Sequence, residues 1–453
     1  QRGTLEAHLE QIAQRFWPDY VGVFQSHGMN RAPGSIRTDE MVDATGARAL
    51  TRFGAFMESM LTPRNSLWHG LIPSDKTLMR NRLTRLWFEE VRDILFRYRY
   101  APKANFQSQK HQDYLGLGSF GTACLFTDKL VGKYEKGLRY RSIHLGEIYF
   151  LENHQGIIDT AMRKFDLTAR QAVQKFGAEN CSAKVLQANG IPTKQEEKFW
   201  FIHCVRPRDE EDGYDPGRLD VRGMQHGSYY CDVEQKTIVK EEGYYTFPYS
   251  ISRYVIAPGE VYGRSPAMMA LPSQKTLNEQ KKTVLKQGHR IVDPVLLAHD
   301  DGVLDTFSLK NGAVNYGGVT ADGKPLVHVL PTGNLALAKE MMEMEIATIN
   351  DFFLVSLFEI LIEKPQMTAT EVLERAREKG ALLSPTMGRQ QSESLGPQIE
   401  RELDVLQQLK LLPPMPPMLR DAKGEYSITY DSPLSRMAKA ESAAGTMRTV
   451  QWA

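Results

Sequence analysis

A glycine-rich stretch at residues 116–121 comes nearest to a catalytic or ligand-binding motif. It reads Gly-Leu-Gly-Ser-Phe-Gly, and the G-x-G-x-x-G spacing can hold phosphate groups against backbone N–H groups. A kinase would also need a V-A-I-K strand, an H-R-D loop and a D-F-G motif, none of which occurs. A dinucleotide site needs a strand before the glycines and a helix after them, and this sequence predicts the reverse order. We therefore interpret the stretch as a helix-to-strand corner, with a nucleotide-binding enzyme as the alternative.

The remaining reactive side chains form no catalytic or metal-binding pattern. The eleven histidines lack the H-x-x-x-H and H-E-x-x-H spacings of zinc sites. The four cysteines include no C-x-x-C pair and are too sparse for a disulfide scaffold, which predicts reduced, buried thiols. The acidic run from Asp209 to Asp212 is typical of a solvated loop, and no serine has a G-x-S-x-G context. The sequence therefore predicts no enzyme, no metal site and no cofactor.

The composition is that of a folded protein with balanced charge. The 453 residues are 42% hydrophobic and 25% charged, enough for roughly two to four domains with buried cores. There are 56 Lys and Arg residues and 55 Asp and Glu residues, a net charge of +1. A dedicated, tight nucleic-acid binder shows a clear basic excess, so that class is disfavoured, whereas weak contact with DNA is not. The most apolar window, residues 346–362, contains polar and acidic side chains and predicts no membrane span.

Hydrophobic periodicity predicts an α+β chain that begins with helices. These helices cover residues 4–16, 39–61, 75–100 and 105–115. Short strands are predicted at residues 124–126, 139–151, 198–206, 228–233, 236–240 and 251–256. One helix, residues 169–176, interrupts them, with Thr168 as its N-cap and Gly177 as its C-terminal stop. Two more helices are predicted near the end, at residues 368–383 and 398–411.

Two long helices of opposite charge are the most informative part of this pattern. They cover residues 266–290 and 334–362, and a compact β segment, residues 293–333, joins them. The first is basic and the second is acidic. A helical wheel gathers the cations of the first helix on one face, namely Lys275, Lys282, Lys286, His289 and Arg290. Such helices could form a hairpin inside one monomer, or they could line up with copies of themselves in a ring of subunits.

The apolar side chains of these helices predict contacts between subunits. The run from Phe352 to Phe358 is more apolar than a single core face requires, and obligate interfaces are large and apolar. Heterologous contacts close into a ring when their rotation divides a full turn. We therefore expect interface residues on both helices, namely Leu277, Val284, Glu340, Glu343, Phe352, Phe353 and Phe358.

Several further motifs occur in order along most of the chain. They are Ala55–Pro63 with Trp68–Leu71, Tyr262–Asn278, Met367–Val372, Leu383–Arg389, Gln398–Arg401 up to Pro414, and Tyr430–Leu434. Together they resemble the portal, or head-to-tail connector, proteins of short-tailed, podovirus-type bacteriophages. The stretch at 262–278 is the most specific, and it resembles the family's entry into its first stem helix. Family members generally continue well past the S-P-L element at Ser432–Leu434, so a small crown or residues beyond Ala453 are expected.

The resemblance implies the portal fold, with an α/β wing, a two-helix stem, a small β-rich clip, a tunnel loop and a helical crown. The wing would cover residues 1–264, with a helical part to residue 121 and a β-rich part after it. The other parts would be the stem helices 265–290 and 334–362, the clip 291–333, the tunnel loop 363–367, and wing completion with crown at 368–453. The implied protein is a structural one, a twelve-fold ring at one capsid vertex of the virion. It would be assembled in the host cytoplasm and conduct DNA during packaging and ejection.

The resemblance also implies partners and site residues. Double-stranded DNA would pass residues of the tunnel loop and stem, namely Glu363, Lys364, Pro365, Gln366, Met367, Lys275, Lys282 and Lys286. The stem lysines could instead pair with acidic residues of the neighbouring subunit, and both possibilities stay open. The clip would bind the terminase motor and later the head-to-tail adaptor through Asp300, Asp301, Lys310, Tyr316 and Lys324. The major capsid protein and internal core or ejection proteins are further expected partners. A monomeric DNA-binding or scaffolding module is the other alternative.

Overall fold

The structure is a computed structural model. It describes residues 2–24, 34–130, 132, 136–298, 308–320, 322–331, 335–355, 386–421 and 424–431. Within this part of the chain, helices and antiparallel sheets are both extensive, which confirms the predicted α+β class. Every described helix is too short or too polar to cross a bilayer.

The first helices are close to those predicted. They are α1 (Arg2–Phe16), α2 (Thr45–Leu61), α3 (Arg82–Arg99) and α4 (Phe106–Phe120). However, α2 begins at Thr45 and not at residue 39, and α4 runs to Phe120 and not only to residue 115. The prediction of a helix from residue 75 was wrong at its start, because Lys76–Arg80 is a separate 3-10 turn. Asn81 then begins α3, since its side chain accepts a hydrogen bond from the N–H of Leu83 at 2.8 Å.

The glycine-rich stretch is a corner between α4 and a strand, as predicted. Gly116 and Gly118 lie inside α4, and Gly121 follows it with a φ of +72°. A Cβ at Gly121 would lie only 2.4 Å from the carbonyl oxygen of Gly263. A glycine is therefore required here both by the backbone conformation and by the close approach of a second segment.

Two antiparallel sheets follow. A three-stranded sheet has the order β3-β2-β9 and a five-stranded sheet the order β4-β5-β6-β7-β8. The strands are β2 (Thr122–Lys129), β3 (Leu138–Ile143), β4 (Ile148–Glu152), β5 (Ile158–Thr168), β6 (Lys198–Pro207), β7 (His226–Asp232), β8 (Thr237–Tyr244) and β9 (Tyr249–Arg253). The single strand predicted at 139–151 was wrong, because a short turn at Leu145–Glu147 divides it into β3 and β4, which join different sheets. The long strand β5 was not predicted.

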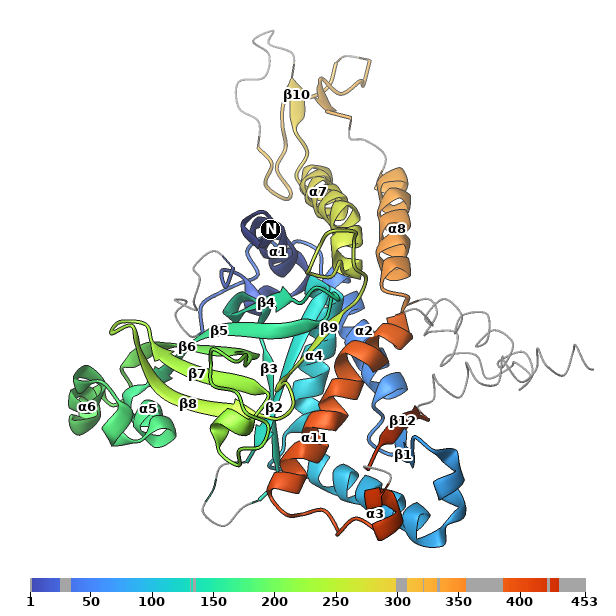
Figure 1. Ribbon diagram of the computed structural model, residues 1–453. Helices are drawn as coiled ribbons and strands as arrows, with labels where there is room; N and C mark the ends of the chain where they lie inside the picture. Colours follow the sequence, from blue (N-terminus) through green and yellow to red (C-terminus); the bar gives the residue numbers. More distant parts are fainter. Residues whose placement is uncertain are drawn as a thin grey trace, which may run out of the picture.

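Helices α5 (Ala169–Phe176) and α6 (Ala183–Gly190) lie at the end of the five-stranded sheet farthest from the C-terminal helices (Figure 1). Thr168 and Gln171 form the capping box of α5, which confirms the predicted N-cap. The helices pack on one face of the sheet and enclose a small core that includes Phe165, Phe176 and Phe201.

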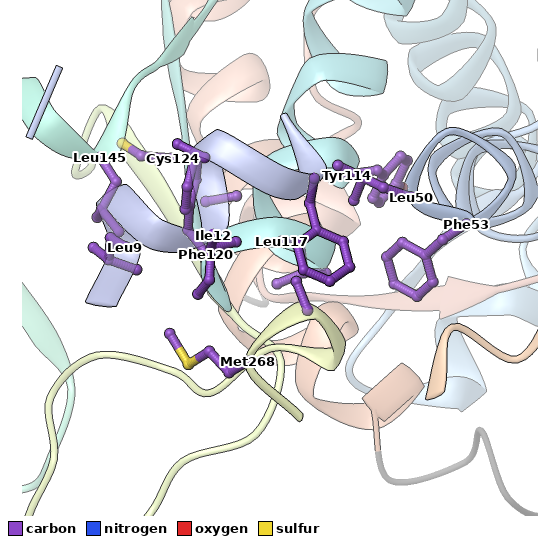
Figure 2. Close-up of a cluster of buried hydrophobic side chains, with 14 of the residues drawn as sticks. Leu9, Ile12, Leu50, Phe53, Tyr114, Leu117, Phe120, Cys124, Leu145 and Met268 are labelled. Carbon is purple, nitrogen blue, oxygen red and sulfur yellow. The ribbon is translucent and has the colours of Figure 1, made fainter. Parts of the chain in front are cut away.

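The main core joins the N-terminal helices to the first long helix, α7 (Pro266–Val292). Figure 2 shows Met268 of α7 near Leu9 and Phe120, with side chains of α1, α2 and α4. The lower part of α7 is therefore held inside the body. Its upper part projects from the body and leads to the two short strands β10 (Leu296–Ala298) and β11 (Val327–Val329), which pair antiparallel (Figure 1). The chain returns through α8 (Leu335–Phe352), which contacts α7.

The C-terminal segments pack against the N-terminal third of the chain. Helix α11 (Gly396–Gln408) confirms most of the helix predicted at 398–411, and α12 (Pro417–Asp421) follows it. Strand β1 (His69–Pro73) pairs with β12 (Tyr426–Tyr430), and neither strand was predicted. Before α11, residues Gln390–Leu395 form a π-helical turn. Pro397 explains it, because proline has no N–H and its ring would clash with the carbonyl four residues earlier in an α-helix.

Candidate functional site

The root of the α7–α8 hairpin is set by one polar face of α7. Gln274, Asn278 and Lys281 occupy positions i, i+4 and i+7 of that face, and all three bind Asp43 in the loop before α2. Gln274 Nε2 donates to the Asp43 carbonyl at 3.1 Å, and Asn278 Oδ1 accepts from the Asp43 N–H at 3.0 Å. Since Gln274 and Asn278 are buried, breaking these bonds would leave unsatisfied polar groups. The direction in which α7 leaves the body is therefore strongly constrained.

An ion pair completes this anchor. Lys281 Nζ lies 2.8 Å from Asp43 Oδ2, and Thr45 N donates to Asp43 Oδ1 at 2.8 Å. Burial alone would raise the pKa of the Asp43 carboxyl, but the hydrogen bonds from Lys281 and Thr45 outweigh burial and lower the pKa. A carboxyl with a lowered pKa in the folded state adds its full stabilisation above the unfolded pKa, near 4. That stabilisation is lost as the pH falls through the lowered value.

Replacing Lys281 by methionine is expected to lower the stability of the protein by about 1–2 kcal/mol at pH 7, because Asp43 loses its charged partner. The difference from the parent chain should shrink as the pH falls below about 4, the unfolded pKa, and through the lowered pKa of the folded Asp43 carboxyl. Urea unfolding midpoints at pH 7, 5 and 3 measure both effects. The matched control is Lys282→Met on the exposed side of the same helix, and equal losses in the two variants would contradict the role of Asp43.

The predicted channel lysines of α7 do not share one environment. Lys275 Nζ donates to Gln11 Oε1 of α1 at 2.7 Å. Lys282 forms an ion pair with Glu279 of its own helix at 2.8 Å. Both side chains therefore have partners within the chain. These interactions satisfy part of their hydrogen-bonding capacity before any neighbour or ligand arrives.

Unlike Lys275 and Lys282, Lys286 lies next to another cation, Arg290, which was not among the predicted channel residues. Lys286 and Arg290 lie at positions i and i+4 on the exposed side of α7. Within the described part of the chain, neither side chain has an ion-pair partner. They line a cavity of about 370 Å³ together with residues at the base of the β10–β11 tip, namely Val295, Leu330 and Pro331. Like charges at this spacing repel each other. An anion between them would relieve that repulsion.

Two of the residues predicted to contact a neighbouring subunit lie inside the chain itself. Leu277 and Phe353 are fully buried in the main core. The prediction placed them at an interface because the sequence shows that these positions are apolar but not what covers them. Phe352 packs against the same core, and Val284 lines a groove between α7 and α8. Phe358 lies outside the described residues.

The acidic face of α8 is exposed, as an interface role requires. Glu340 and Glu343 both face solvent. Next to them, Leu337, Met341 and Met344 follow an i, i+4, i+7 spacing, and Met344 is 69% exposed. This apolar stripe was missed in the sequence, although its spacing could have revealed it. The prediction of one helix to residue 362 was wrong, because α8 ends at Phe352 and a turn follows in which Leu354 has a φ of +58°. Residues 356–362 lie outside the described part.

The remaining predicted site residues fall into two groups. Lys310, Tyr316 and Lys324 lie in the segment between β10 and β11 and are exposed, and the Tyr316 side chain is 86% exposed. The residues of the other group lie outside the described part of the chain, namely Asp300, Asp301, Glu363, Lys364, Pro365, Gln366 and Met367. The helix predicted at 368–383 also lies outside it.

Comparisons with known proteins point to one family. A family model described as bacteriophage head to tail connecting protein matches residues 1–453. The chain is 27% identical to a probable portal protein of Bordetella phage BPP-1, over 97% of this chain and 78% of that protein. It is 26% identical to the portal protein of Salmonella phage epsilon15, over 98% of this chain and 78% of that protein. A chain from the neck of an empty GTA particle, solved with C6 symmetry, matches 74% of this chain over 70% of its own length, at 10% identity and with a TM-score of 0.33.

Proposed function

The chain belongs to the family of bacteriophage head-to-tail connecting proteins, and from this premise we propose that it works as the portal at one vertex of the capsid. Copies of the chain form a ring, and the viral DNA passes through the ring during packaging and ejection. The family match confirms the resemblance seen in the sequence. The protein is a structural component of the virion, and we propose that it has no catalytic activity of its own.

The α7–α8 hairpin is the observation that carries this proposal (Figure 1). A buried root fixes α7 to the body, and a small β tip lies at the far end. In the portal assignment, residues 1–264 are the wing, 265–290 and 334–362 the stem, 291–333 the clip, 363–367 the tunnel loop, and 368–453 the wing completion with crown. Exposed cations on α7 and exposed carboxylates on α8 give each subunit two flanks of opposite charge, which suits a ring of twelve copies.

Contact with DNA is assigned chiefly to the upper end of α7. Each phosphate that a cation neutralises strengthens binding and makes it depend on salt. A channel lined densely with cations would therefore hold the duplex and slow its passage. Lys275 and Lys282 have partners within the chain, so Lys286 and Arg290 are the best placed residues of α7 to touch phosphates. The tunnel loop with Lys364 is proposed as a second point of contact.

We assign each expected partner protein to one surface of the subunit. The exposed side chains of the segment between β10 and β11 suit docking of the terminase motor and, later, of the head-to-tail adaptor, with Lys310, Tyr316 and Lys324 as contact residues. Asp300 and Asp301 belong to the same proposed docking surface. The wing is proposed to meet the major capsid protein, and the crown side to meet internal core or ejection proteins.

Native mass measurement of the purified chain tests the ring. Twelve copies of the 51.3 kDa chain weigh about 616 kDa, and averaged end-on images should show a central opening wide enough for duplex DNA. A solitary particle near 51 kDa without an opening would contradict the proposal and favour a monomeric DNA-binding or scaffolding module. Nucleotide binding by such a particle would instead favour the enzyme alternative. Gly121 argues against that alternative, since its α-carbon packs against the Gly263 backbone.

A further inference from the structure

The five-stranded sheet has two apolar faces, and the described part of the chain covers only one of them. Its inner face packs against α5 and α6 at one end and against the main core at the other, through residues such as Phe165, Phe201 and Phe150. An antiparallel sheet with one face in solvent normally alternates apolar and polar side chains along each strand. Here the outward positions are largely apolar as well.

Strand register places these outward side chains in adjacent rows. One row crosses the sheet from Tyr149 through Met162 and Cys204 to Tyr229. The next row runs from Lys164 through Ile202 and Cys231 to Ile238. Trp200 and Leu151 extend the surface on either side, and Lys164 Nζ lies 5.2 Å from the centre of the Trp200 ring. We call these ten residues the outer-face patch.

None of the patch residues belongs to a buried core of the described chain. Leu151 is 57% exposed, Met162 42% and Ile238 61%. Cys204 and Cys231 are half-buried, and each lies on a strand with a paired strand on both sides. An apolar surface that joins five strands is larger than the scattered apolar side chains of an ordinary protein surface. It has the character of a surface that another molecule covers.

Lys164 is the one charged member of the patch, and its Nζ lies over the Trp200 ring, whereas several charged side chains around the patch form ion pairs. Arg206 Nη2 lies 2.6 Å from Asp212, and Lys198 Nζ lies 2.7 Å from Asp166. Glu241, at the edge strand, pairs with Arg208 at 2.9 Å. An apolar centre with aromatic and methionine side chains inside a polar rim is the anatomy of a protein–protein interface. It is a poor fit to nucleic acid, which would need unpaired cations.

We propose that a second copy of this chain covers the outer-face patch when the ring forms. The inference rests on the proposed ring. Obligate interfaces are large and apolar, and they bury about 2,000 Å² or more. The exposed apolar side chains of the hairpin are spread along its length, from Leu285 and Val292 of α7 to Met344 of α8. The outer-face patch instead joins five strands of the wing in adjacent rows, so it can add a broad apolar area to the contact with the same neighbour.

The surface around the patch also leads towards the hairpin. Tyr149, at its edge, lies under the guanidinium of Arg2 at 4.1 Å, at the start of α1. Further along α1, Gln11 accepts the hydrogen bond from Lys275 of α7. A neighbour that contacts the exposed flank of α7 is thus close to α1 and to the patch. One neighbour can cover the wing patch and the stem flank together.

The cysteines of the chain supply the test. In the purified ring, before any capsid protein is added, Cys204 and Cys231 should be protected from N-ethylmaleimide at least tenfold compared with protomers dissociated under non-denaturing conditions. Cys181 is equally half-buried but lies between α5 and α6, outside the patch, and should react at the same rate in both states. Cys124 is buried and should stay unmodified in both. Peptide mass spectrometry reads the four sites separately.

The outcomes separate this inference from the proposed function. If rings form and Cys204 and Cys231 react as fast as in protomers, the inference is wrong while the ring stands. Protection that appears only in whole capsids would assign the patch to the shell protein and also overturn the inference. If the chain forms no ring at all, the proposed function itself fails.

A pair of variants gives a second, independent readout. Met162→Glu with Ile202→Glu places two charges on the patch and is expected to abolish rings while leaving a folded protomer, because both side chains point away from the cores. The matched control is Leu186→Glu on α6, a comparably exposed leucine outside the patch. Circular dichroism checks the fold, and intact rings in the double variant would contradict the inference.

Discussion

Replacing Lys286 and Arg290 by glutamine is expected to leave rings of the same mass with a much weaker hold on DNA. Both side chains lack an ion-pair partner among the described residues and line the cavity at the upper end of α7. If each neutralises one phosphate, the slope of log binding constant against log salt falls by roughly 0.9 for each phosphate left without its cation. Repetition around the ring multiplies the effect. Titrating duplex DNA onto purified rings between about 50 and 200 mM salt, a range over which phosphate binding weakens steeply, measures it.

A second variant with the same change of charge is the control. Lys275→Gln with Lys282→Gln removes two cations from the same helix, but these cations bind Gln11 and Glu279 within the chain. For this control ring, the slope of log binding constant against log salt should stay near that of the parent ring. Equal weakening in both variants would show that only the total charge of the stem matters. Loss of the ring in the Lys286/Arg290 variant would show that these cations pair with a neighbouring subunit instead.

Replacing Glu402 by glutamine is expected to destabilise the protein by about 3–5 kcal/mol, because it leaves a buried guanidinium without its counter-charge. Arg99 and Glu402 are both fully buried, and Arg99 Nε lies 3.0 Å from Glu402 Oε2. Tyr140 donates its hydroxyl to Glu402 Oε1 at 2.7 Å. The carboxylate thereby joins α3, α11 and β3.

The histidine beside this cluster is held neutral. Burial, together with the charge of Arg99, lowers the pKa of His69 well below its usual range. Its Nε2 lies 2.8 Å from Arg99 Nη1, so the neutral ring accepts that hydrogen bond. Glu402 is therefore the anion that balances Arg99, and an amide of the same shape cannot replace it.

Urea unfolding of the Glu402→Gln chain at neutral pH measures the loss. Lys184→Met is the control, since Lys184 and Glu234 form an ion pair in solvent and such pairs contribute little. Its midpoint should stay close to that of the parent chain. A Glu402→Gln midpoint equally close to the parent would show that the buried cluster does not hold the C-terminal helix to the N-terminal helices.

The site could be predicted from the sequence only in part, and the hairpin shows where the limit lies. The basic face of α7 follows from residue spacing alone, because a helix puts residues three and four apart on one side. Which lysine stays available does not follow, since Gln11 reaches Lys275 from a helix more than 260 residues earlier. Leu277 and Phe353 were placed at an interface for the same reason, because periodicity cannot tell an internal core from a neighbour.

Elements with local causes follow from the sequence alone. The cap at Thr168, the corner at Gly121 and the start of α7 at Ser265 each depend on a few adjacent residues. Three other features emerge only when the chain is folded, namely the pairing of β1 with β12, the burial of Arg99 against Glu402 and the second apolar face of the five-stranded sheet. These features depend on which distant segments meet, and the residues next to a strand or a charged side chain do not identify the distant partner.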